Sequence, residues 1–524
     1  MKKVTLHDIK ELLESRISQE DITSLKEMPT PIHFKDIEKA TKRICQAIKE
    51  DETINIVGDY DADGVVSTAI MVEFFTKAVG VEVNYIIPNR FTHGYGISAK
   101  ILDDIYEGII ITVDNGISAV EAAEICKQRG LDLIITDHHT VGENIPDAYA
   151  IVNPKQVDCE FPFSDICGAN VAWYLCASIK KELNLQFNLM EFFDLLTIAI
   201  VADVMPMRSL NKTIVKRGLL ELSNSSRPAI VAIKEKFGLK NINEEDIGFK
   251  IAPLINCAGR MEDATIALEF LLSFDEYEAN EQLEYLIGLN ENRKKEQLTI
   301  FEDAKTKVDA SANVVVVYGD DWNEGIVGIV AAKLCEKYKK PSFVFRQNGL
   351  SIKGSGRGNG QINLHTLLSK VSHLLTGFGG HKGAAGLSLK MANFEKFKEE
   401  VNKAYLGVPK EDDFISSDFL CEIDFGLIGK ELFDLINNFR PFGLENSLPI
   451  FKFSTVKVVE IKEIGKSKEY KKIKLENNSY MIEALVFVDV NEVNVGDTID
   501  ILATIDKNEF RNEVTYNLLL KEIL

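Results

Sequence analysis

The chain has 524 residues, of which 45% are hydrophobic and 27% are charged, and its formal net charge is −20 at pH 7. This composition is typical of a globular protein, and the length exceeds what one hydrophobic core serves, so about three or four domains are expected. The negative total argues against a protein that coats nucleic acid by bulk charge, although a local basic groove or a metal-dependent site stays compatible with it.

Neither a membrane segment nor a secretory leader is expected. No apolar run is long enough to span a bilayer, and the start of the chain turns polar at once. The eight cysteines contain no CxxC pair and mostly lie in apolar, helix-like surroundings. We therefore expect free buried thiols, a cytoplasmic location and no membrane partner.

The first part of the chain, residues 1–53, is expected to be a helical lead-in, because its last apolar residues recur at helical spacing. An apolar run at residues 54–57 then predicts a buried strand, and the loop after it carries Asp59, Asp61 and Asp63. Three acids this close repel each other, which favours a bound multivalent cation over a solvated turn or a helix cap.

Strands and helices alternate through the next eighty residues. The expected elements are a helix at about 65–79, a strand within 81–88, a strand at 109–113, a helix at 119–129 and a strand at 133–136. This alternation predicts an α/β fold with a parallel sheet and crossover helices.

Polar residues follow the strands of this sheet: Asp114 comes after one strand, and Asp137, His138 and His139 come after another. The carboxyl ends of parallel strands lie at one edge, so these side chains are expected to converge with the acidic loop in one cleft. Asp203 joins them, because a plain helix C-terminal turn would place its charge at the unfavourable end of the helix dipole.

Several carboxylates combined with imidazole favour Mn²⁺ or Mg²⁺ over metals that prefer thiolates. The carboxylates are numerous enough to hold two ions about 3.5–4 Å apart, the arrangement that activates water for attack on phosphorus.

Four segments, GDYDADG, TVDNG, DHH and ADVMP, resemble the motifs of the DHH phosphoesterase superfamily. The sequence around them resembles the RecJ family, which are 5′-to-3′ exonucleases specific for single-stranded DNA, and Val57 favours that family over the pyrophosphatase branch. The resemblance implies a metal-ligand set of Asp59, Asp61, Asp63, Asp114, His138 and Asp203, with Asp114 bridging two ions and Asp59 either ligating or supporting. It also implies the catalytic candidates Asp114, Asp137 and His139, of which His139 lies beside the scissile phosphate and Asp137 supports its neighbours.

Substrate contacts are implied by further resemblances. Arg260, in PLINCAGRM, would bind a terminal 5′ phosphate, since an arginine fork suits a phosphate monoester. Arg90 and Tyr95, in PNRFTHGYG, would grip and stack the strand. Taken without the resemblance, they are more typical of a surface residue and a core aromatic.

A second α/β unit begins near residue 312 and contains two glycine-rich stretches, where backbone N–H groups can approach phosphate. The segment GGHKGAAG resembles the DHH-associated (DHHA1) substrate domain, although Asn323 and Gly358 depart from the usual family pattern. The substrate-binding candidates in this unit are Ser355, Arg357, Gly379, Gly380 and His381.

Short alternating runs near the end of the chain predict a small β-barrel, which by resemblance is an OB-fold that binds single strands; a purely structural barrel is the alternative. Its lysines would make it locally basic. Glu445 and Ser447, just before the barrel, replace the Gly and Pro expected there. The expected domains are a catalytic domain with its lead-in (1–274), a connecting helix (275–309), a substrate domain (310–410) and the barrel (411–524).

The leading hypothesis is thus a two-metal 5′-to-3′ exonuclease on single-stranded DNA, releasing 5′ mononucleotides in repair and recombination, with a single-strand-binding protein and a helicase as partners. Two alternatives stay open: a phosphodiesterase for short oligoribonucleotides or cyclic dinucleotides, and a non-catalytic replication scaffold. The complete set of acids and histidines argues against the scaffold.

Overall fold

The computed structural model describes residues 4–18, 21–380, 382–410, 419–464, 470–486, 493–510 and 513–524. The described residues form two compact units, one from Met28–Met205 and Arg217–Phe414 and the other from Met1–Glu27, Pro206–Lys216 and Ile415–Leu524. Within the described ranges, no helix combines the length and the apolar character needed to cross a bilayer. The eight cysteines are all free, as expected.

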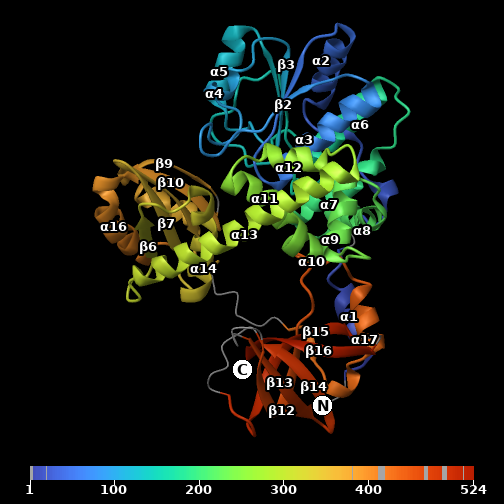
Figure 1. Ribbon diagram of the computed structural model, residues 1–524, viewed down its shortest axis with the longest axis vertical. Helices are drawn as coiled ribbons and strands as arrows, with labels where there is room; N and C mark the ends of the chain where they lie inside the picture. The colour runs from blue at the N-terminus through green and yellow to red at the C-terminus, as the bar shows by residue number, and fades with distance from the viewer. Residues whose placement is uncertain are drawn as a thin grey trace. The chain divides into compact units, whose positions relative to one another are not determined.

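The larger unit begins with a five-stranded parallel sheet of order β2-β1-β3-β4-β5, which confirms the predicted fold class (Figure 1). Its strands are β1 (Ile54–Val57), β2 (Asn84–Ile86), β3 (Ile109–Val113), β4 (Asp132–Thr136) and β5 (Ala150–Val152). Helices cover both faces: α4 (Ala99–Leu102) and α5 (Val120–Arg129) on one, and α2 (Ile37–Lys49), α3 (Ala62–Glu73) and α6 (Gly168–Glu182) on the other. The strand order reverses between β1 and β3, and in such sheets ligands bind at that point, beyond the carboxyl ends.

Helix α3 begins three residues earlier than predicted. The Asp61 side chain caps it by accepting hydrogen bonds from the backbone N–H groups of Asp63 (3.0 Å) and Gly64 (3.2 Å). The helix ends at Glu73, and residues Phe74–Val79 continue as a π-helix. The first turn of α3 is therefore part of the acidic loop.

A helical layer follows the sheet. Its members are α7 (Phe193–Ala202), the part of α8 (Ser209–Asn224) from Arg217 onward, α9 (Pro228–Phe237), α10 (Glu244–Asp246), α11 (Ala252–Met261), α12 (Thr265–Leu271) and α13 (Glu276–Thr306), together with a π-helix at Ile247–Ile251. The long helix α13 matches the polar helix expected between the two α/β parts. It is more than a solvated spacer, because Leu283, Leu286 and Ile300 are buried where it packs against α9, α11 and α14 (Glu324–Tyr338).

The second sheet has the order β6-β7-β8-β10-β9. Its strands are β6 (Val315–Gly319), β7 (Ser342–Asn348), β8 (Ser351–Arg357), β9 (Leu375–Gly380) and β10 (Ala384–Lys390). Helix α14 packs with α13 on one face, and α15 (Leu364–Lys370) and α16 (Phe394–Leu406) pack on the other. The glycine-rich stretches thus lie largely on β8, β9 and β10.

The smaller unit is a closed barrel of five strands, β12 (Phe451–Ile464), β13 (Tyr470–Asn477), β14 (Tyr480–Val486), β15 (Thr498–Phe510) and β16 (Glu513–Ile523). Pairing of β12 with β15 closes it, and β11 (Cys421–Glu422) extends one edge. The predicted barrel is confirmed. Lys466 and Lys468, counted in its basic composition, lie outside the described residues.

The start of the chain corrects one expectation. Helix α1 (Leu6–Glu14) belongs to the barrel unit, where Ile9 and Leu13 are buried in the same core as strand residues such as Phe451. A lead-in to the first domain was expected from residues 1–53. Helical spacing identified an apolar face, and only the tertiary fold shows which core that face joins.

Candidate metal centre and substrate cleft

The predicted ligands converge at the carboxyl edge of the parallel sheet. Among the residues that the structure describes, three groups of side chains have ligand atoms within 4.8 Å of one another. The groups are Asp59, Asp61 and Asp114; Asp63, His138 and Asp203; and Asp114, His138 and His139. Because the groups share Asp114 and His138, they form one continuous cluster, which we call the acidic cluster.

Asp63 is held by the beginning of helix α6. Its carboxylate accepts hydrogen bonds from the backbone N–H groups of Gly168 (2.6 Å) and Ala169 (2.9 Å), where the helix dipole favours negative charge. A Cβ at Gly168 would lie 2.4 Å from Oδ1 of Asp114. Only glycine therefore allows α6 to come this close to both acids.

Asp114 adopts a left-handed backbone conformation, with φ of 63°, which is unusual for a residue other than glycine. Its neighbour Asn115 is fully buried and donates hydrogen bonds to the carbonyl oxygens of Val57, Gly58 and Val113 at 2.9–3.0 Å. These bonds fasten the end of β3 to the end of β1, and strain of this kind is typical of a functional site.

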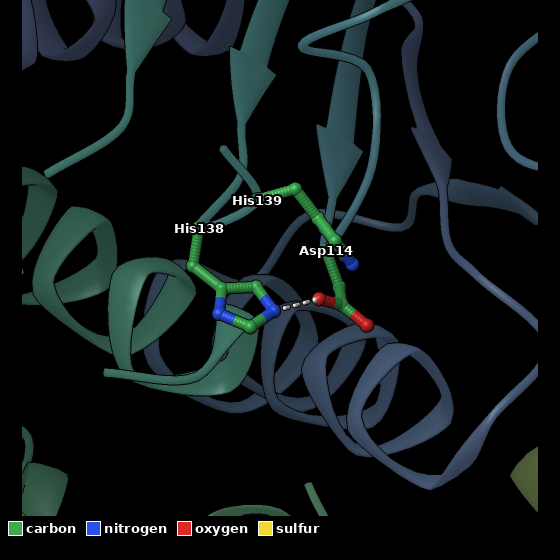
Figure 2. A group of neighbouring side chains, drawn as sticks. All are labelled: Asp114, His138 and His139. Atoms are coloured by element: carbon green, nitrogen blue, oxygen red, sulfur yellow. Dashed lines mark ion pairs between the residues drawn. The ribbon is translucent and has the colours of Figure 1, made fainter. Parts of the chain in front are cut away.

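His138 lies at the middle of the acidic cluster. Its Nε2 is 3.2 Å from Oδ1 of Asp114, a contact shown in Figure 2, and 3.6 Å from Oδ2 of Asp203. The same nitrogen is 3.8 Å from Oδ2 of Asp63. One imidazole nitrogen thus faces three of the expected ligands.

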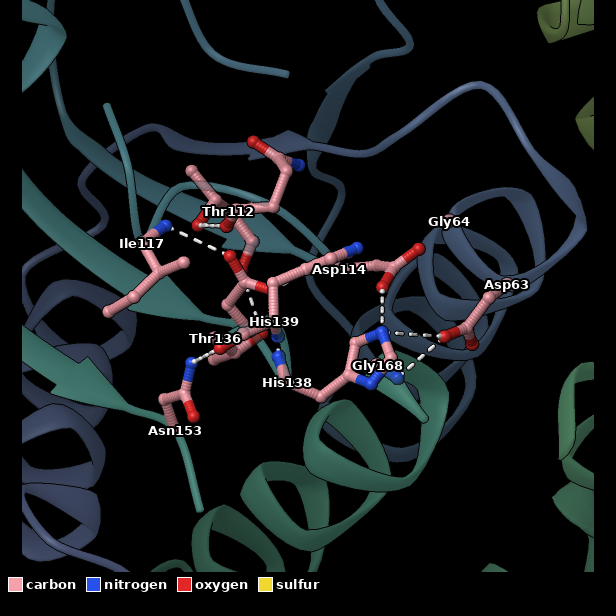
Figure 3. Close-up of polar contacts among 12 residues, drawn as sticks. Asp63, Gly64, Thr112, Asp114, Ile117, Thr136, His138, His139, Asn153 and Gly168 are labelled. Atoms are coloured by element: carbon pink, nitrogen blue, oxygen red, sulfur yellow. Dashed lines mark hydrogen bonds and ion pairs between the residues drawn. The ribbon is translucent and has the colours of Figure 1, made fainter. Parts of the chain in front are cut away.

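Asp137 is buried, and its carboxylate is hydrogen-bonded within its own loop and to the loop after β3. Figure 3 shows its labelled neighbours His138, His139 and Ile117. Its Oδ1 accepts hydrogen bonds from the backbone N–H groups of His138 (2.7 Å) and His139 (3.0 Å) and lies 2.7 Å from Nδ1 of His139. Its Oδ2 accepts one from Ile117 (2.9 Å). Asp137 therefore positions the histidine pair, whereas the His139 side chain is 46% exposed.

Electrostatics in the acidic cluster favour a bound cation. Burial and the neighbouring acids raise the pKa of Asp59 and Asp114 well above the usual range, and they raise the pKa of Asp63 to about 6 and of Asp203 to about 8. Four carboxyl groups cannot all ionise here without a cation.

The two histidines differ in charge. Burial, helped by the charge of His139, lowers the pKa of His138 to about 3, so its ring is neutral and free to coordinate. Burial also opposes protonation of His139, but the hydrogen bond and charge of Asp137 outweigh it and raise the pKa of His139 to about 9.

The residues fit divalent cations. Oδ1 of Asp59, Oδ1 of Asp114 and Oδ2 of Asp203 are buried and accept no hydrogen bond from any described residue. Buried oxygens without donors are costly, and a hard cation is the partner that would satisfy several of them at once.

A cleft of about 310 Å³ lies beside the cluster, between the first domain and the second sheet. Arg90 and Tyr95 line it from the first domain, and Ser355 and Gly379 line it from the second sheet. The Arg90 guanidinium stacks on the Tyr60 ring at 3.8 Å, and the Tyr95 hydroxyl is 3.4 Å from Nε2 of His139. Four predicted substrate residues thus line one cleft, and one of them, Tyr95, contacts the catalytic candidate His139.

Arg260 and Arg357 do not line this cleft but lie close enough to each other to interact. Burial, followed by repulsion from Arg90 and other arginines that include Arg357, lowers the pKa of Arg260 to about 10. Nη1 of Arg260 donates to the carbonyl oxygen of Gly325 (3.2 Å), and Nη1 of Arg357 donates to that of Gly356 (2.8 Å). Such a concentration of guanidinium groups is suited to an anion.

Two predicted residues of the glycine-rich stretch are not placed in the cleft. Gly380 has a φ of 139° and a backbone too close to Ala384 for any Cβ, so it shapes the end of β9. His381 lies outside the described residues.

Some contributors to the site escaped the sequence analysis. Asn115 is one, and Asn256 is another, since its Oδ1 accepts a hydrogen bond from the backbone N–H of Ala62 at the start of α3 (3.0 Å). Tyr60, beneath Arg90, is a third. All three lie within the motifs quoted above, but local spacing indicates no role for them, because each acts on a segment distant in the chain or on a loop whose shape is not local.

Three family sequence models match the chain. They are the DHH family, N-terminal domain (residues 53–200), the DHHA1 domain (residues 311–406) and the RecJ OB domain (residues 421–522). The fold and the acidic cluster thus define a DHH-family protein.

Relatives narrow this class. The chain is 34% identical over 509 residues to the single-stranded-DNA-specific exonuclease RecJ of Bacillus subtilis, covering 94% of this chain and 64% of that protein. It is 33% identical to the RecJ of Escherichia coli, covering 73% of this chain and 71% of that protein. The chain belongs to the RecJ family.

Solved structures agree. The RecJ of Thermus thermophilus in complex with Mn²⁺ superposes with a TM-score of 0.84 at 25% identity, covering 99% of this chain and 76% of that one. An exonuclease RecJ bound to manganese gives a TM-score of 0.64 at 30% identity, covering 73% of this chain and 97% of that one. The parallel sheet, the second domain and the barrel are therefore those of the family.

Proposed function

We propose that this protein is a metal-dependent exonuclease that degrades single-stranded DNA from the 5′ end and releases 5′ mononucleotides. The observation that carries the proposal is the acidic cluster, with its unsatisfied carboxylate oxygens, beside a cleft lined by Arg90, Tyr95 and Ser355. The names of the relatives, single-stranded-DNA-specific exonucleases, support the substrate.

Two divalent ions, Mn²⁺ or Mg²⁺, would be held by Asp61, Asp63, Asp114, His138 and Asp203, with Asp59 at their edge. When bound, such ions supply an activated water and stabilise the charge that develops on the phosphoryl oxygens. The Mn²⁺ and Mg²⁺ complexes of relatives support this assignment.

The protein's own residues bind and orient the DNA strand. Arg90 and Tyr95 hold the strand next to His139, and the protonated His139 ring donates to the scissile phosphate, while Asp137 keeps it oriented. Arg260 and Arg357 bind the terminal 5′ phosphate and thereby set the direction of degradation. The barrel binds the strand outside the catalytic cleft.

The setting we propose is repair and recombination in the cytoplasm, where a helicase would supply single strands and a single-strand-binding protein would deliver them. The free thiols suit such a reducing compartment.

The test uses the full chain, Mn²⁺ and single-stranded DNA labelled at either end. We expect 5′ mononucleotides from the parent protein, none from Asp114→Ala, and parental rates from Asp158→Ala, which removes an exposed acid. Degradation from the 3′ end would contradict the roles of Arg260 and Arg357. Cleavage of only short RNA or cyclic dinucleotides would make the protein a phosphodiesterase of that class. If the protein turned over none of these substrates, the non-catalytic replication scaffold would be the remaining hypothesis.

A further inference from the structure

Helices α3 and α7, which pack against each other, connect the acidic cluster with a second charged site at their opposite ends. Asp63 lies in the first turn of α3 and Asp203 directly follows α7, and both face His138. At the other ends, Glu73 is the last residue of α3 and Asp194 is the second residue of α7. A helix as long as α3 spans about 18 Å, so the two sites are well separated.

Arg227 joins the two helices at these opposite ends. Its Nη1 forms an ion pair with Oε1 of Glu73, and its Nε lies 3.2 Å from Oδ2 of Asp194. All three side chains are less than a tenth exposed. Arg227 itself precedes α9, so a third element holds α3 and α7. Lys77 also contacts Glu73, at 3.1 Å, but it follows α3 in the chain and makes no link to α7.

A cavity of about 660 Å³ opens onto this ion-pair network. Arg227, Glu73 and Asp194 line it together with aromatic side chains such as Phe192 and Phe274. A small cation could therefore reach the two carboxylates if the arginine side chain were absent.

We propose that Arg227 is a positioning residue for the metal centre: its guanidinium fixes the offset between α3 and α7, and thereby the spacing between Asp63 and Asp203. The inference rests on the proposed metal-dependent function, but metal binding tests it without turnover.

The packing of the helices explains how loss of Arg227 would change the positions of Asp63 and Asp203. All residues of α3 are buried, and so are Phe193–Ile200 of α7, so each helix moves as a rigid body against its neighbours. Without Arg227, two buried carboxylates of like charge would face each other and push the helix ends apart. The planar fork of arginine contacts both at once, which a lysine ammonium on a flexible stem does less well.

The test measures the affinity for Mn²⁺ by the electron paramagnetic resonance signal of the free ion. Arg227→Ala should weaken Mn²⁺ binding by about 2–30-fold, because coupling carried through packed elements over such a distance is about 0.5–2 kcal/mol. Guanidinium, added below denaturing concentration, should enter the cavity and restore the affinity of Arg227→Ala, but not that of Asp114→Ala.

The matched control is Arg43→Ala. Arg43 is similarly buried and pairs with Glu52 and Asp132, each at 2.6 Å, but at the amino-terminal side of the sheet. The Arg43→Ala substitution should lower the thermal stability of the protein and leave its Mn²⁺ affinity at the parental value. If Arg227→Ala behaves like Arg43→Ala, or if guanidinium restores its stability without its affinity, Arg227 is merely structural and the inference is wrong.

Two further outcomes remain decisive. If Arg227→Ala does not fold, Arg227→Lys replaces it: an affinity below the parent supports the inference, and a parental affinity overturns it. If the parent binds Mn²⁺ but degrades no DNA, the proposed function fails while the Mn²⁺ measurements still decide the role of Arg227.

Discussion

At the scale of single residues, the acidic cluster depends on close approach as much as on charge. Helix α6 can present its first N–H groups to Asp63 only because Gly168 has no side chain to strike Asp114. The strained backbone of Asp114 is in turn held by the hydrogen bonds of Asn115. The positions of the ligands are therefore set by neighbours that do not touch a metal.

Gly168→Ala tests this dependence. The new Cβ would lie 2.4 Å from Oδ1 of Asp114, so α6 or Asp114 must shift, which costs about 1–3 kcal/mol in a packed interior. We expect lower thermal stability together with weaker Mn²⁺ binding, measured by thermal denaturation with and without Mn²⁺. Gly142→Ala is the control, because open space surrounds that position. If Gly168→Ala bound Mn²⁺ as tightly as the parent protein, Asp114 would tolerate the displacement and the prediction would be wrong.

At the scale of elements, helices α11 and α14 bring the first domain and the second sheet together. A Cβ at Gly325, in the first turn of α14, would lie 2.1 Å from the carbonyl oxygen of Arg260 in α11. The carbonyl oxygen of Gly325 also accepts the hydrogen bond from the Arg260 side chain. This contact orients Arg260, the expected phosphate ligand, relative to the second sheet.

Gly325→Ala should therefore separate the two helices and misplace Arg260. We expect KM for 5′-phosphorylated single strands to rise by about 10-fold or more, since a charge-assisted hydrogen bond contributes about 1.5–3 kcal/mol. Mn²⁺ affinity should change much less than KM, because no side chain of the acidic cluster lies on α11 or α14. Steady-state kinetics on 5′-phosphorylated and 5′-hydroxyl substrates checks this; an equal loss on both would contradict a role in phosphate binding.

At the scale of the whole molecule, the two units have separate hydrophobic cores. The barrel core includes Ile9 and Leu13 of α1, so one unit is assembled from the beginning and the end of the chain. A ligand or a core substitution should therefore change the stability of only the unit in which it lies.

Scanning calorimetry should accordingly resolve two transitions. Mn²⁺ at about 100 times its Kd should stabilise only the larger unit, by about 2.7 kcal/mol. Ile9→Ala should destabilise only the barrel unit, by about 2–5 kcal/mol, because Ile9 is completely buried there. A shift of both transitions by either change would mean that the units unfold as one.

The sequence by itself determined much of the fold and the composition of the site. Apolar runs ending in Asp59, Asp114 and Asp137 predicted the parallel sheet, and all these acids lie at its carboxyl edge, since every strand of a parallel sheet ends on the same side. Period-two runs predicted the barrel in the same way. Such patterns can be read from the sequence because they follow from the geometry of a single strand, in which side chains alternate between the two faces.

Only the tertiary structure decided what depends on contacts between distant segments. It assigned α1 to the barrel and joined Arg227 to Glu73 and Asp194. The physical reason is that burial, pairing and close approach are properties of surfaces that meet in space. A residue type shows that a side chain can pair or pack, and the fold selects its partner.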